Sequence, residues 1–381
     1  MTEHPLATWL KRGLVAVTTV VVVAWVAGVW VMSSTLGRDL LTPQPEEPTF
    51  DLEIATVGGG TVVLTRTPIT ERDSVWGLES ETAYGQVSAV VAIREDVVER
   101  GFRTLEGEMR PGDRVRFDPF AYTGDPRTAH GIPFEEVRIA GELGAYPAWK
   151  VEGDRDTWVI VIHGKGSDER RQALRMLPAF RDDGFPVLVI TYRNDLGAPA
   201  APDGRYRWGR TEWRDVEAAV EFALRQGAEE LVLYGFSMGG EIASMFLHES
   251  DHVGGVVGVV LDSPVLDLEA TVDAEASQRG VPGILVGGAK TLATLRFDID
   301  WRELDQVERA GEFDVPVLLM HGSADETVPV APSDEFAAAR PGLVRYERFE
   351  GGRHVQLWNE DPVRYETAVR LFLAEVAAPL L

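Results

Sequence analysis

Short apolar runs that alternate with helical patterns dominate the sequence after Phe134 and restrict the folds it can adopt. The runs are TWVIVIHG, FPVLVITY, ELVLYGFS, GGVVGVVLDSP, VPVLLMHGSAD and LVRYERFEGG. The stretch before them, FEEVRIAGELGAYPAWKVEG, predicts a hairpin, and a closing helix is expected over Pro362–Val376. Strands that are apolar on both faces and alternate with helices form a parallel sheet covered on both sides. The sequence therefore predicts an α/β fold.

One strand-to-helix turn, in the stretch LVLYGFSMGGEIAS, carries the pattern G-x-S-x-G around Ser237. In a parallel sheet the site lies beyond the carboxyl ends of the strands, and a serine on such a turn projects its hydroxyl there. Glycines at 235 and 239 leave the room that this strained turn needs. A glycine corner without chemistry is the alternative. A base, an acid and an oxyanion donor at other strand ends would decide against it.

Two further strand ends supply an acid and a base. Asp325 follows the run VPVLLMHGSAD, and His354 lies in a glycine-flanked loop before the last helix. A serine hydroxyl is a weak nucleophile unless a base takes its proton, and the base needs a carboxylate to orient it. We therefore predict Ser237, Asp325 and His354 as catalytic residues, with Asp262, also at a strand end, as the alternative acid.

An oxyanion needs backbone donors near the serine. The N–H of Met238 opens the helix after Ser237 and is the first candidate. The loop HGKGS follows the first strand of the series, and we assign the second donor to the N–H of Lys165. His163 is expected to form a hydrogen bond within this loop and not to act on substrate.

Together, VIVIHGKGS, LYGFSMGG, LLMHGSADETVP and GGRHVQLW resemble the α/β-hydrolase fold family, and within it the bacterial serine esterase and peptidase-like branch with an HGxxDxxVP acid loop. The resemblance covers residues 134–381. It implies an α/β-hydrolase with a mostly parallel sheet, a Ser237 nucleophile, an Asp325 acid, a His354 base and an oxyanion hole at Met238 and Lys165. It implies no cofactor and no metal.

Residues 14–32 form a run of 19 uncharged residues that is long enough to span a membrane as a helix. Trp9, Trp25 and Trp30 lie near its ends, as expected at a membrane interface. A cleaved signal peptide is the alternative, but its apolar core is usually shorter and its cleavage site better defined than the stretch SSTLG. We predict an uncleaved single-pass anchor in the cell membrane.

The charges around this run predict its orientation. Lys11 and Arg12 precede it, and Arg38 follows it. The excess of positive charge before the run predicts that the N-terminus lies in the cytoplasm and everything after Arg38 lies outside. Residues 1–40 are thus assigned to the tail and anchor, and 41–49, rich in proline, to a linker that holds the body away from the bilayer.

Residues 50–133 contain short apolar alternations between turn signals and predict a small β-rich region of unknown role. Within residues 134–381, the stretch 265–315 is longer than one crossover helix and predicts a lid, an ordinary core helix being the alternative. Four arginines follow the strand FPVLVITY, and we expect them to balance acidic neighbours and not to attract an anionic substrate. They are Arg193, Arg205, Arg207 and Arg210.

A competing motif occurs at His248-Glu249-Ser250-Asp251-His252, which matches the zinc-protease pattern H-E-x-x-H. We expect the helix to end inside this motif because two glycines follow at 254 and 255, and the motif lies far from the strand-end face. These two features weigh against zinc binding, and a zinc metalloprotease is kept as an alternative to the serine hydrolase. A non-catalytic scaffold protein is a further alternative. The presence of all three candidate catalytic residues disfavours the scaffold.

Composition excludes further classes. The chain has no cysteine, so disulfides, thiolate nucleophiles and cysteine-ligated metals are absent. A net charge of −24 repels phosphate backbones, so we expect no nucleic-acid partner. The sequence predicts a membrane-anchored serine hydrolase, with a carboxylesterase placed first and a serine peptidase of the same fold second. The expected substrate is a small ester or acyl compound, or a peptide.

Overall fold

The larger part of the chain folds around an eight-stranded sheet in a computed structural model that describes residues 5–43, 48–166 and 169–377. The strands follow one another across the sheet in the order β14-β13-β12-β11-β9-β10-β8-β7. They comprise β7 (Glu135–Gly141), β8 (Gly144–Val151), β9 (Thr157–Ile162), β10 (Val187–Ile190), β11 (Glu230–Phe236), β12 (Val256–Asp262), β13 (Val317–Gly322) and β14 (Val344–Phe349).

The six strands from β9 to β14 run parallel, and the hairpin β7–β8 extends the sheet through the antiparallel pairing of β8 with β10. Each of the apolar runs read from the sequence forms one of these parallel strands, and the predicted hairpin is β7–β8. This confirms the predicted α/β fold. The parallel strands bring their carboxyl ends to one edge, where the loops after β9, β11, β13 and β14 meet.

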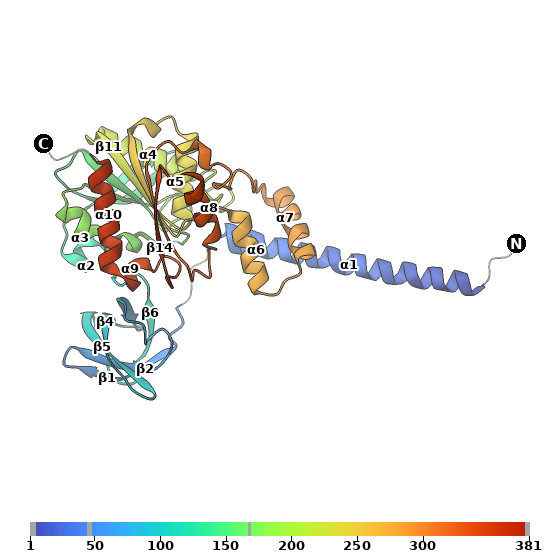
Figure 1. Cartoon of the computed structure of the whole chain (residues 1–381), viewed down its shortest axis with the longest axis horizontal. Helices are drawn as coiled ribbons and strands as arrows, with labels where there is room; N and C mark the ends of the chain where they lie inside the picture. The colour runs from blue at the N-terminus through green and yellow to red at the C-terminus, as the bar shows by residue number, and fades with distance from the viewer. Residues whose placement is uncertain (1–4, 44–47, 167–168, 378–381) are drawn as a thin grey trace.

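Helices cover both faces of the sheet because successive strand residues point to opposite sides (Figure 1). In β13, Val317 and Leu319 enter one hydrophobic core, whereas Leu318 and Met320 enter the other. The covering helices are α3 (Leu177–Asp182), α4 (Trp213–Arg225), α5 (Met238–Glu249), α8 (Ala331–Ala339), α9 (Leu357–Glu360) and α10 (Pro362–Val376). Short helical segments complete the layer at α2 (Pro126–His130), η1 (Glu169–Arg175), η2 (Val253–Gly255) and η3 (Ala310–Glu312).

The β-rich region before the sheet is a closed antiparallel barrel with the strand order β1-β2-β5-β4-β3-β6. Its strands are β1 (Leu52–Gly58), β2 (Thr61–Thr65), β3 (Trp76–Glu79), β4 (Tyr84–Ile93), β5 (Val97–Glu106) and β6 (Arg114–Asp118). The apolar alternations that the sequence shows, DLEIATV, TVVLTRT, QVSAVVAI and DRVRFDPFAY, correspond to β1, β2, β4 and β6, whereas β3 and β5 were not expected. Strand β5 reads VVERGFRTLE and includes Arg100, whose side chain is buried and donates to backbone carbonyls of Ser88, Thr70 and Ser74.

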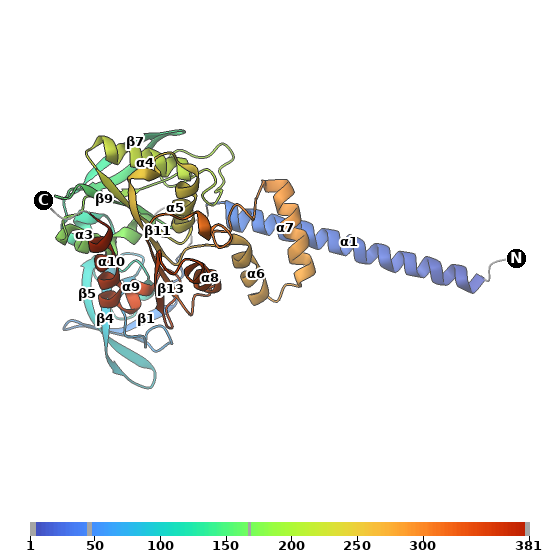
Figure 2. The ribbon, with the colours of Figure 1, turned by 45° about the horizontal axis from the view of Figure 1, so that its top comes forward.

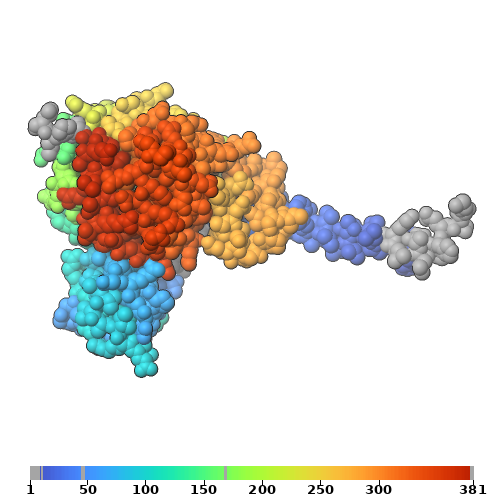
Figure 3. Space-filling view, viewed as in Figure 1, coloured from blue at the N-terminus to red at the C-terminus, as the bar shows by residue number. Residues whose placement is uncertain are grey.

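The barrel forms a lobe beside the larger domain (blue and cyan in Figure 3). Asn359 in α9 joins the two, because its side-chain amide donates to the carbonyls of Val75 (2.7 Å) and Pro119 (2.8 Å). The backbone of Val75 donates in turn to the carbonyl of Asn359 (2.9 Å), and Arg72 pairs with Glu360. Asn359 is fully buried, so this junction excludes water.

The N-terminal helix α1 (Pro5–Leu41) projects from the larger domain, α7 (Gly283–Phe297) packs against it, and α6 (Leu268–Gln278) packs against α7. Figure 2 shows α7 crossing α1 close to the domain. The last turns of α1 are part of the domain core, with Leu36, Leu40 and Leu41 buried. Residues 1–4 and the centre of the predicted linker, 44–47, lie outside the described residues.

This course of α1 differs from the arrangement expected of a linker that separates membrane and body. The helix itself reaches the larger domain, and the proline-rich stretch that follows leads from α1 to the barrel. The sequence could not show this, because the core that Leu36, Leu40 and Leu41 enter is otherwise formed by segments from residue 137 onward.

Candidate active site

Ser237 occupies the turn between β11 and α5 with a backbone φ of 49°, a conformation that residues other than glycine rarely adopt. Gly235 and Gly239 make this turn possible. A Cβ at Gly235 would lie 2.6 Å from the backbone of Gly240, and one at Gly239 would overlap the carbonyl oxygens of Ile162 and of the residue after it. The strained backbone conformation is therefore that of Ser237, the residue whose hydroxyl the turn projects.

The three side chains predicted to act together meet at the carboxyl edge of the sheet. Ser237 Oγ lies 2.9 Å from His354 Nε2, and His354 Nδ1 lies 2.7 Å from Asp325 Oδ2. Since the carboxylate can only accept, Nδ1 carries the proton and Nε2 accepts from the serine hydroxyl. The Asp325 side chain is fully buried, whereas His354 is 20% exposed, so solvent and substrate can reach the histidine.

Asp325 is held by four donors. His354 and His321 donate to Oδ2, and the backbone N–H groups of Thr327 (2.9 Å) and Val328 (2.8 Å) donate to Oδ1. Burial alone would raise the pKa of Asp325, but the hydrogen bonds from His321 and His354 outweigh it and hold the pKa below its usual range. The carboxylate is therefore ionised across the physiological range.

His321 is a neighbour of the site that the sequence analysis did not identify. Its Nε2 lies 3.1 Å from Asp325 Oδ2, and its Nδ1 accepts from Ser333 Oγ (2.6 Å). The signal was present, since His321 begins the HGSAD stretch four residues before the aspartate. It donates to the same carboxylate oxygen as His354.

The alternative acid, Asp262, serves a different network. It is fully buried at the end of β12, where Tyr365 (2.6 Å) and Ser263 (2.9 Å) donate to its two oxygens. Burial raises the pKa of Asp262, in contrast to Asp325. The hydrogen bond of His354 Nδ1 goes to Asp325, so the geometry favours Asp325 as its partner.

The loop that carries His354 is fixed from two sides. Val355 has a φ of 52°, and its N–H donates to Ser263 Oγ (3.1 Å). Its carbonyl accepts from the buried guanidinium of Arg175 (2.8 Å), which also donates to Asn359 (3.1 Å). Because Asn359 holds the barrel, the barrel and the His354 loop share one buried hydrogen-bond network.

The loop after β9 lies against the serine from the other side. A Cβ at Gly164 would be 3.3 Å from Ser237 Cβ, so the backbone passes very close to it. His163 is buried; it contacts the carbonyl of Gly164 (2.7 Å) as predicted and also Asp195 (2.8 Å). Tyr192 stacks on the His163 ring and donates to the same carbonyl (2.6 Å). Asp195 and Tyr192 were not identified from the sequence.

The two predicted oxyanion donors lie at either side of this contact. Met238 is the first residue of α5, directly after Ser237, where the N–H groups of a helix point outward. Lys165 follows Gly164 in the loop, and its ammonium group donates to the carbonyl of Asp39 at the end of α1. Helix α1 thus contacts the loop beside the serine.

The four arginines after β10 are all ion-paired, in line with the expectation that they balance acidic neighbours. The pairs are Arg193–Asp215 (2.8 Å), Arg205–Asp203 (3.7 Å), Arg207–Asp203 (2.6 Å) and Arg210–Glu303 (2.6 Å). Arg207 and Arg210 also donate to the carbonyls of Phe297 and Asp298. They therefore hold the C-terminal end of α7 on the domain.

The HESDH stretch is divided by the end of α5 at Glu249, as predicted. His248 contacts Gln306 (2.8 Å), whereas His252 lies beyond the helix and contacts Glu221 (3.4 Å). The two histidines do not share a helical face. In the part of the chain that the structure describes, no three His, Asp or Glu side chains are grouped to hold a metal ion.

Comparison with known families gives separate matches for the barrel and for part of the larger domain. Residues 53–118, the barrel, match a domain of unknown function, DUF8805. Residues 173–355 match the prolyl oligopeptidase family. The second match includes Ser237, Asp325 and His354 and begins after the loop that carries Lys165. A search of curated proteins finds no match.

Solved structures share the fold. The esterase Pf2001 of Pyrococcus furiosus, in one crystal form, has a TM-score of 0.55 and 20% identity, covering 68% of this chain and 96% of its own. DcsB, solved with its substrate analogue, has a TM-score of 0.50 and 15% identity, covering 64% of this chain and 100% of its own. Together with the match to the prolyl oligopeptidase family, this architecture identifies the chain as a serine hydrolase of the α/β-hydrolase fold.

Proposed function

We propose that this protein is a membrane-anchored serine carboxylesterase in which Ser237, His354 and Asp325 form the catalytic triad. The observation that carries the proposal is the continuous hydrogen-bond chain from Ser237 Oγ through both nitrogens of His354 to the buried, ionised Asp325. An acyl transfer requires this order of groups, because His354 is placed to receive the proton of Ser237 and Asp325 is placed to stabilise the charged His354.

The reaction follows from that geometry. Ser237 Oγ attacks the ester carbonyl carbon, and His354 Nε2 takes the serine proton. The negative charge on the carbonyl oxygen is stabilised by the backbone N–H groups of Met238 and Lys165. His354 then gives its proton to the departing alcohol, which leaves an acyl-enzyme. Water, deprotonated by His354, attacks this ester and releases the acid, so one ester and one water become one acid and one alcohol.

A serine peptidase is the second candidate, and the match to the prolyl oligopeptidase family favours it. Esters stand first because an alkoxide is a better leaving group than the amide anion of a peptide, so the same triad cleaves esters with less assistance from its acid. The Pyrococcus furiosus protein with the same fold is described as an esterase, which is consistent with this order.

The anchor belongs to the proposal as well. Helix α1 contains one segment long and apolar enough to cross a membrane, and most of that segment is exposed. Large apolar side chains are exposed from Leu14 to Val31, a length of about 26 Å at the helical rise, which approaches the thickness of the hydrocarbon layer. The packing of Leu36, Leu40 and Leu41 into the domain core argues for retention of α1 over its removal as a signal peptide.

The experiment that tests this function compares p-nitrophenyl acetate and butyrate with a proline-containing peptide p-nitroanilide, using the full chain in mild detergent. We expect the esters to be hydrolysed, and Ser237→Ala to lower kcat/KM by about 10⁴-fold or more. Preference for the peptide would favour the peptidase. Undiminished ester hydrolysis by Ser237→Ala would contradict the triad. Loss of activity with a chelator would instead support the zinc alternative.

A further inference from the structure

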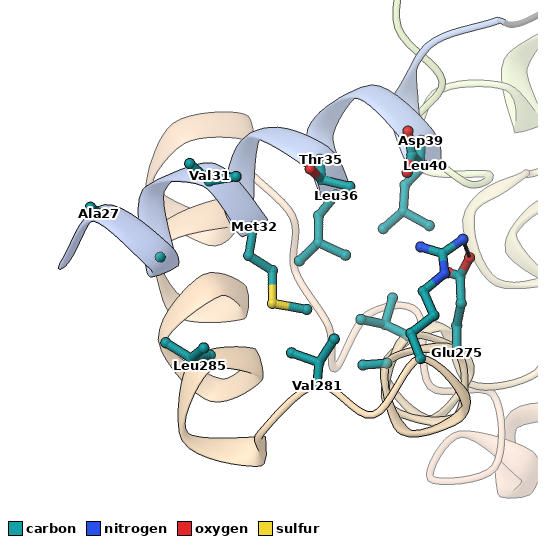
Figure 4. A pocket seen from close by; sticks show the side chains of 14 residues that line it. Ala27, Val31, Met32, Thr35, Leu36, Asp39, Leu40, Glu275, Val281 and Leu285 are labelled. Carbon is teal, nitrogen blue, oxygen red and sulfur yellow. Dashed lines mark ion pairs between the residues drawn. The ribbon is translucent and has the colours of Figure 1, made fainter. Parts of the chain in front are cut away.

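Between the anchor helix α1 and the helices α6 and α7 lies a cavity of about 530 Å³, within the size range of small-molecule sites (Figure 4). Three of its fourteen lining residues are charged, namely Asp39, Glu275 and Arg279. The remaining ones are Ala27, Gly28, Val31, Met32, Thr35, Leu36, Leu40, Val272, Ala276, Val281 and Leu285. No step proposed above uses this cavity.

The cavity has an apolar end and a polar end. Figure 4 shows Ala27, Val31 and Leu285 at one end, and Asp39 and Glu275 at the other. Glu275 forms an ion pair with Arg279 (2.7 Å) at the polar end. From Ala27 to Asp39 the helix rises about 18 Å, so the cavity follows α1 for about three turns.

The apolar end lies at the depth of the exposed, membrane-spanning surface of α1. A Cβ at Gly28 would lie 3.4 Å from Leu285, and one at Gly288 would lie 2.7 Å from Val29 and 3.1 Å from Trp25. Close approach at small residues is typical of helices that pack in lipid. Helix α7 therefore lies beside the last two turns of the predicted span and not above it.

The outer face of α7 suits contact with lipid. Ile284 is 73% exposed and Leu295 is 79% exposed. The one lysine of α7, Lys290, turns toward α6 and pairs with Glu269 (2.7 Å) and Asp273 (2.7 Å). This leaves the outward surface of α7 without a charge between its first residue and Arg296.

Arg296 marks the boundary with water. Its guanidinium stacks on Trp30 at 4.2 Å and donates to Ser33 (3.2 Å) and Ser34 (2.9 Å). An arginine over a tryptophan, with hydroxyl groups on the aqueous side, is the arrangement expected at a membrane interface. The apolar end of the cavity lies on the lipid side of this boundary, and the polar end lies on the side of the catalytic domain.

The polar end is connected to both catalytic loops. The carbonyl of Asp39 accepts from Lys165, which lies in the loop beside Ser237. At the end of α6, Gln278 donates to the carbonyl of Glu326 (3.0 Å), the residue after Asp325. A ligand in the cavity would therefore touch elements that are one hydrogen bond away from the oxyanion loop and the acid loop.

We infer that this cavity binds one acyl chain of a membrane lipid, with the chain between α1, α6 and α7 and the ester group at the end near Asp39 and Arg279. The inference rests on the proposed function, because it names the substrate class of the proposed esterase. An acyl chain fits the apolar lining, and its source is the bilayer because the apolar end adjoins the lipid-facing surface of α1. A peptide would leave its backbone groups unpaired there.

Photo-crosslinking tests the binding separately from the chemistry. The full chain with Ser237→Ala is placed in nanodiscs that contain phosphatidylcholine with a diazirine at the middle of one acyl chain. We expect crosslinks on cavity residues of α6 and α7, such as Val281 and Leu285. Crosslinks confined to the exposed surface of α1, with none on α6 or α7, would overturn the inference.

Matched variants sharpen the test. Ala276→Phe fills the cavity from α6, and Ala27→Phe, at an exposed position of α1, serves if the first variant does not fold. Ala24→Phe lies one turn away on the same helix, is also exposed and does not line the cavity. We expect crosslinking of α6 and α7 to fall at least fivefold in the cavity variants and to persist in Ala24→Phe. Equal crosslinking in all three would contradict the inference.

Kinetics with active protein distinguish failure of this inference from failure of the proposed function. The measured quantity is the ratio of two rates, that of hydrolysis of a long-chain lipid ester in nanodiscs and that of hydrolysis of p-nitrophenyl butyrate. We expect this ratio to fall about tenfold in Ala27→Phe and to stay constant in Ala24→Phe. Hydrolysis of neither ester would contradict the esterase, while the crosslinks still report binding. Faster cleavage of the same ester dispersed in water than in nanodiscs would overturn the membrane as source.

Discussion

At the scale of single residues, two buried aspartates at neighbouring strand ends differ in what faces them. Asp325 receives two histidine donors that keep its pKa low, whereas burial raises the pKa of Asp262. Asp325→Asn would present an amide that cannot stabilise a charged His354 and favours the wrong tautomer. We expect kcat to fall by about 10²–10⁴-fold with little change in KM, measured with p-nitrophenyl butyrate.

Asp262→Asn is the matched control for this variant. An amide resembles the protonated acid that a raised pKa favours, and it can still accept from Tyr365. We expect kcat within a few-fold of the wild type. A larger loss of kcat in Asp262→Asn than in Asp325→Asn would show that Asp262, and not Asp325, is the acid of the triad.

Glu241 gives a prediction on stability. It is fully buried in α5, where Gln306 donates to Oε1 (2.8 Å) and Oε2 has no partner. Burial raises the pKa of Glu241 well above its usual value, so the folded protein keeps a proton that the unfolded chain loses above about pH 4.3. Stability from this group is therefore present at low pH and lost as pH rises.

Glu241→Gln should remove that dependence. The free energy of unfolding of the variant, relative to wild type, should rise with pH by up to about 1.4 kcal/mol per unit above pH 4.3. Urea unfolding of the full chain in detergent between pH 4 and pH 8 measures this difference. A difference that is constant over this range would show that Glu241 is ionised in the folded state.

At the scale of elements, the packing of α7 on α1 depends on small residues. A Cβ at Gly37 would overlap the ring of Phe297, whereas one at Gly13 would meet nothing within 4 Å. The free energy of unfolding of Gly37→Ala should therefore be about 1–3 kcal/mol lower than that of Gly13→Ala. Both variants gain helix propensity, so that contribution cancels in the comparison. Faster hydrogen exchange of α7 in Gly37→Ala alone would be the local sign. Equal exchange in both variants would show that α1 does not hold α7.

The elements that sequence predicts and those it does not predict differ in the range of their interactions. The parallel strands and the helix Pro362–Val376 follow from local pattern, and Ser237, Asp325 and His354 follow from their place after strands. Strand β5 did not, because Arg100 interrupts its apolar alternation and finds its partners only inside the closed barrel. His321 and the contact of Lys165 with α1 depend on tertiary structure and have no local period.

At the scale of the whole molecule, α1, α6 and α7 lie together at one end of the larger domain, and the barrel lies to the side (Figure 1). We expect the protein to resist extraction by alkaline carbonate, and protease added to intact spheroplasts to cleave the catalytic domain. This follows from the exposed apolar surface of α1 and the positive charges before it. Release of the protein by carbonate would indicate that α1 has been removed. Protection of the catalytic domain from the protease would indicate the opposite orientation, with this domain in the cytoplasm.

The central claim is that Ser237 is an activated nucleophile, and covalent labelling tests it most directly. The full chain in detergent is treated with a fluorophosphonate probe, digested and analysed by mass spectrometry, alongside Ser237→Ala and with or without chelator. The account predicts one adduct, on the peptide that contains Ser237, absent from the variant and unaffected by the chelator. Folded wild-type protein that takes up no probe, or takes it up on another residue, would contradict it.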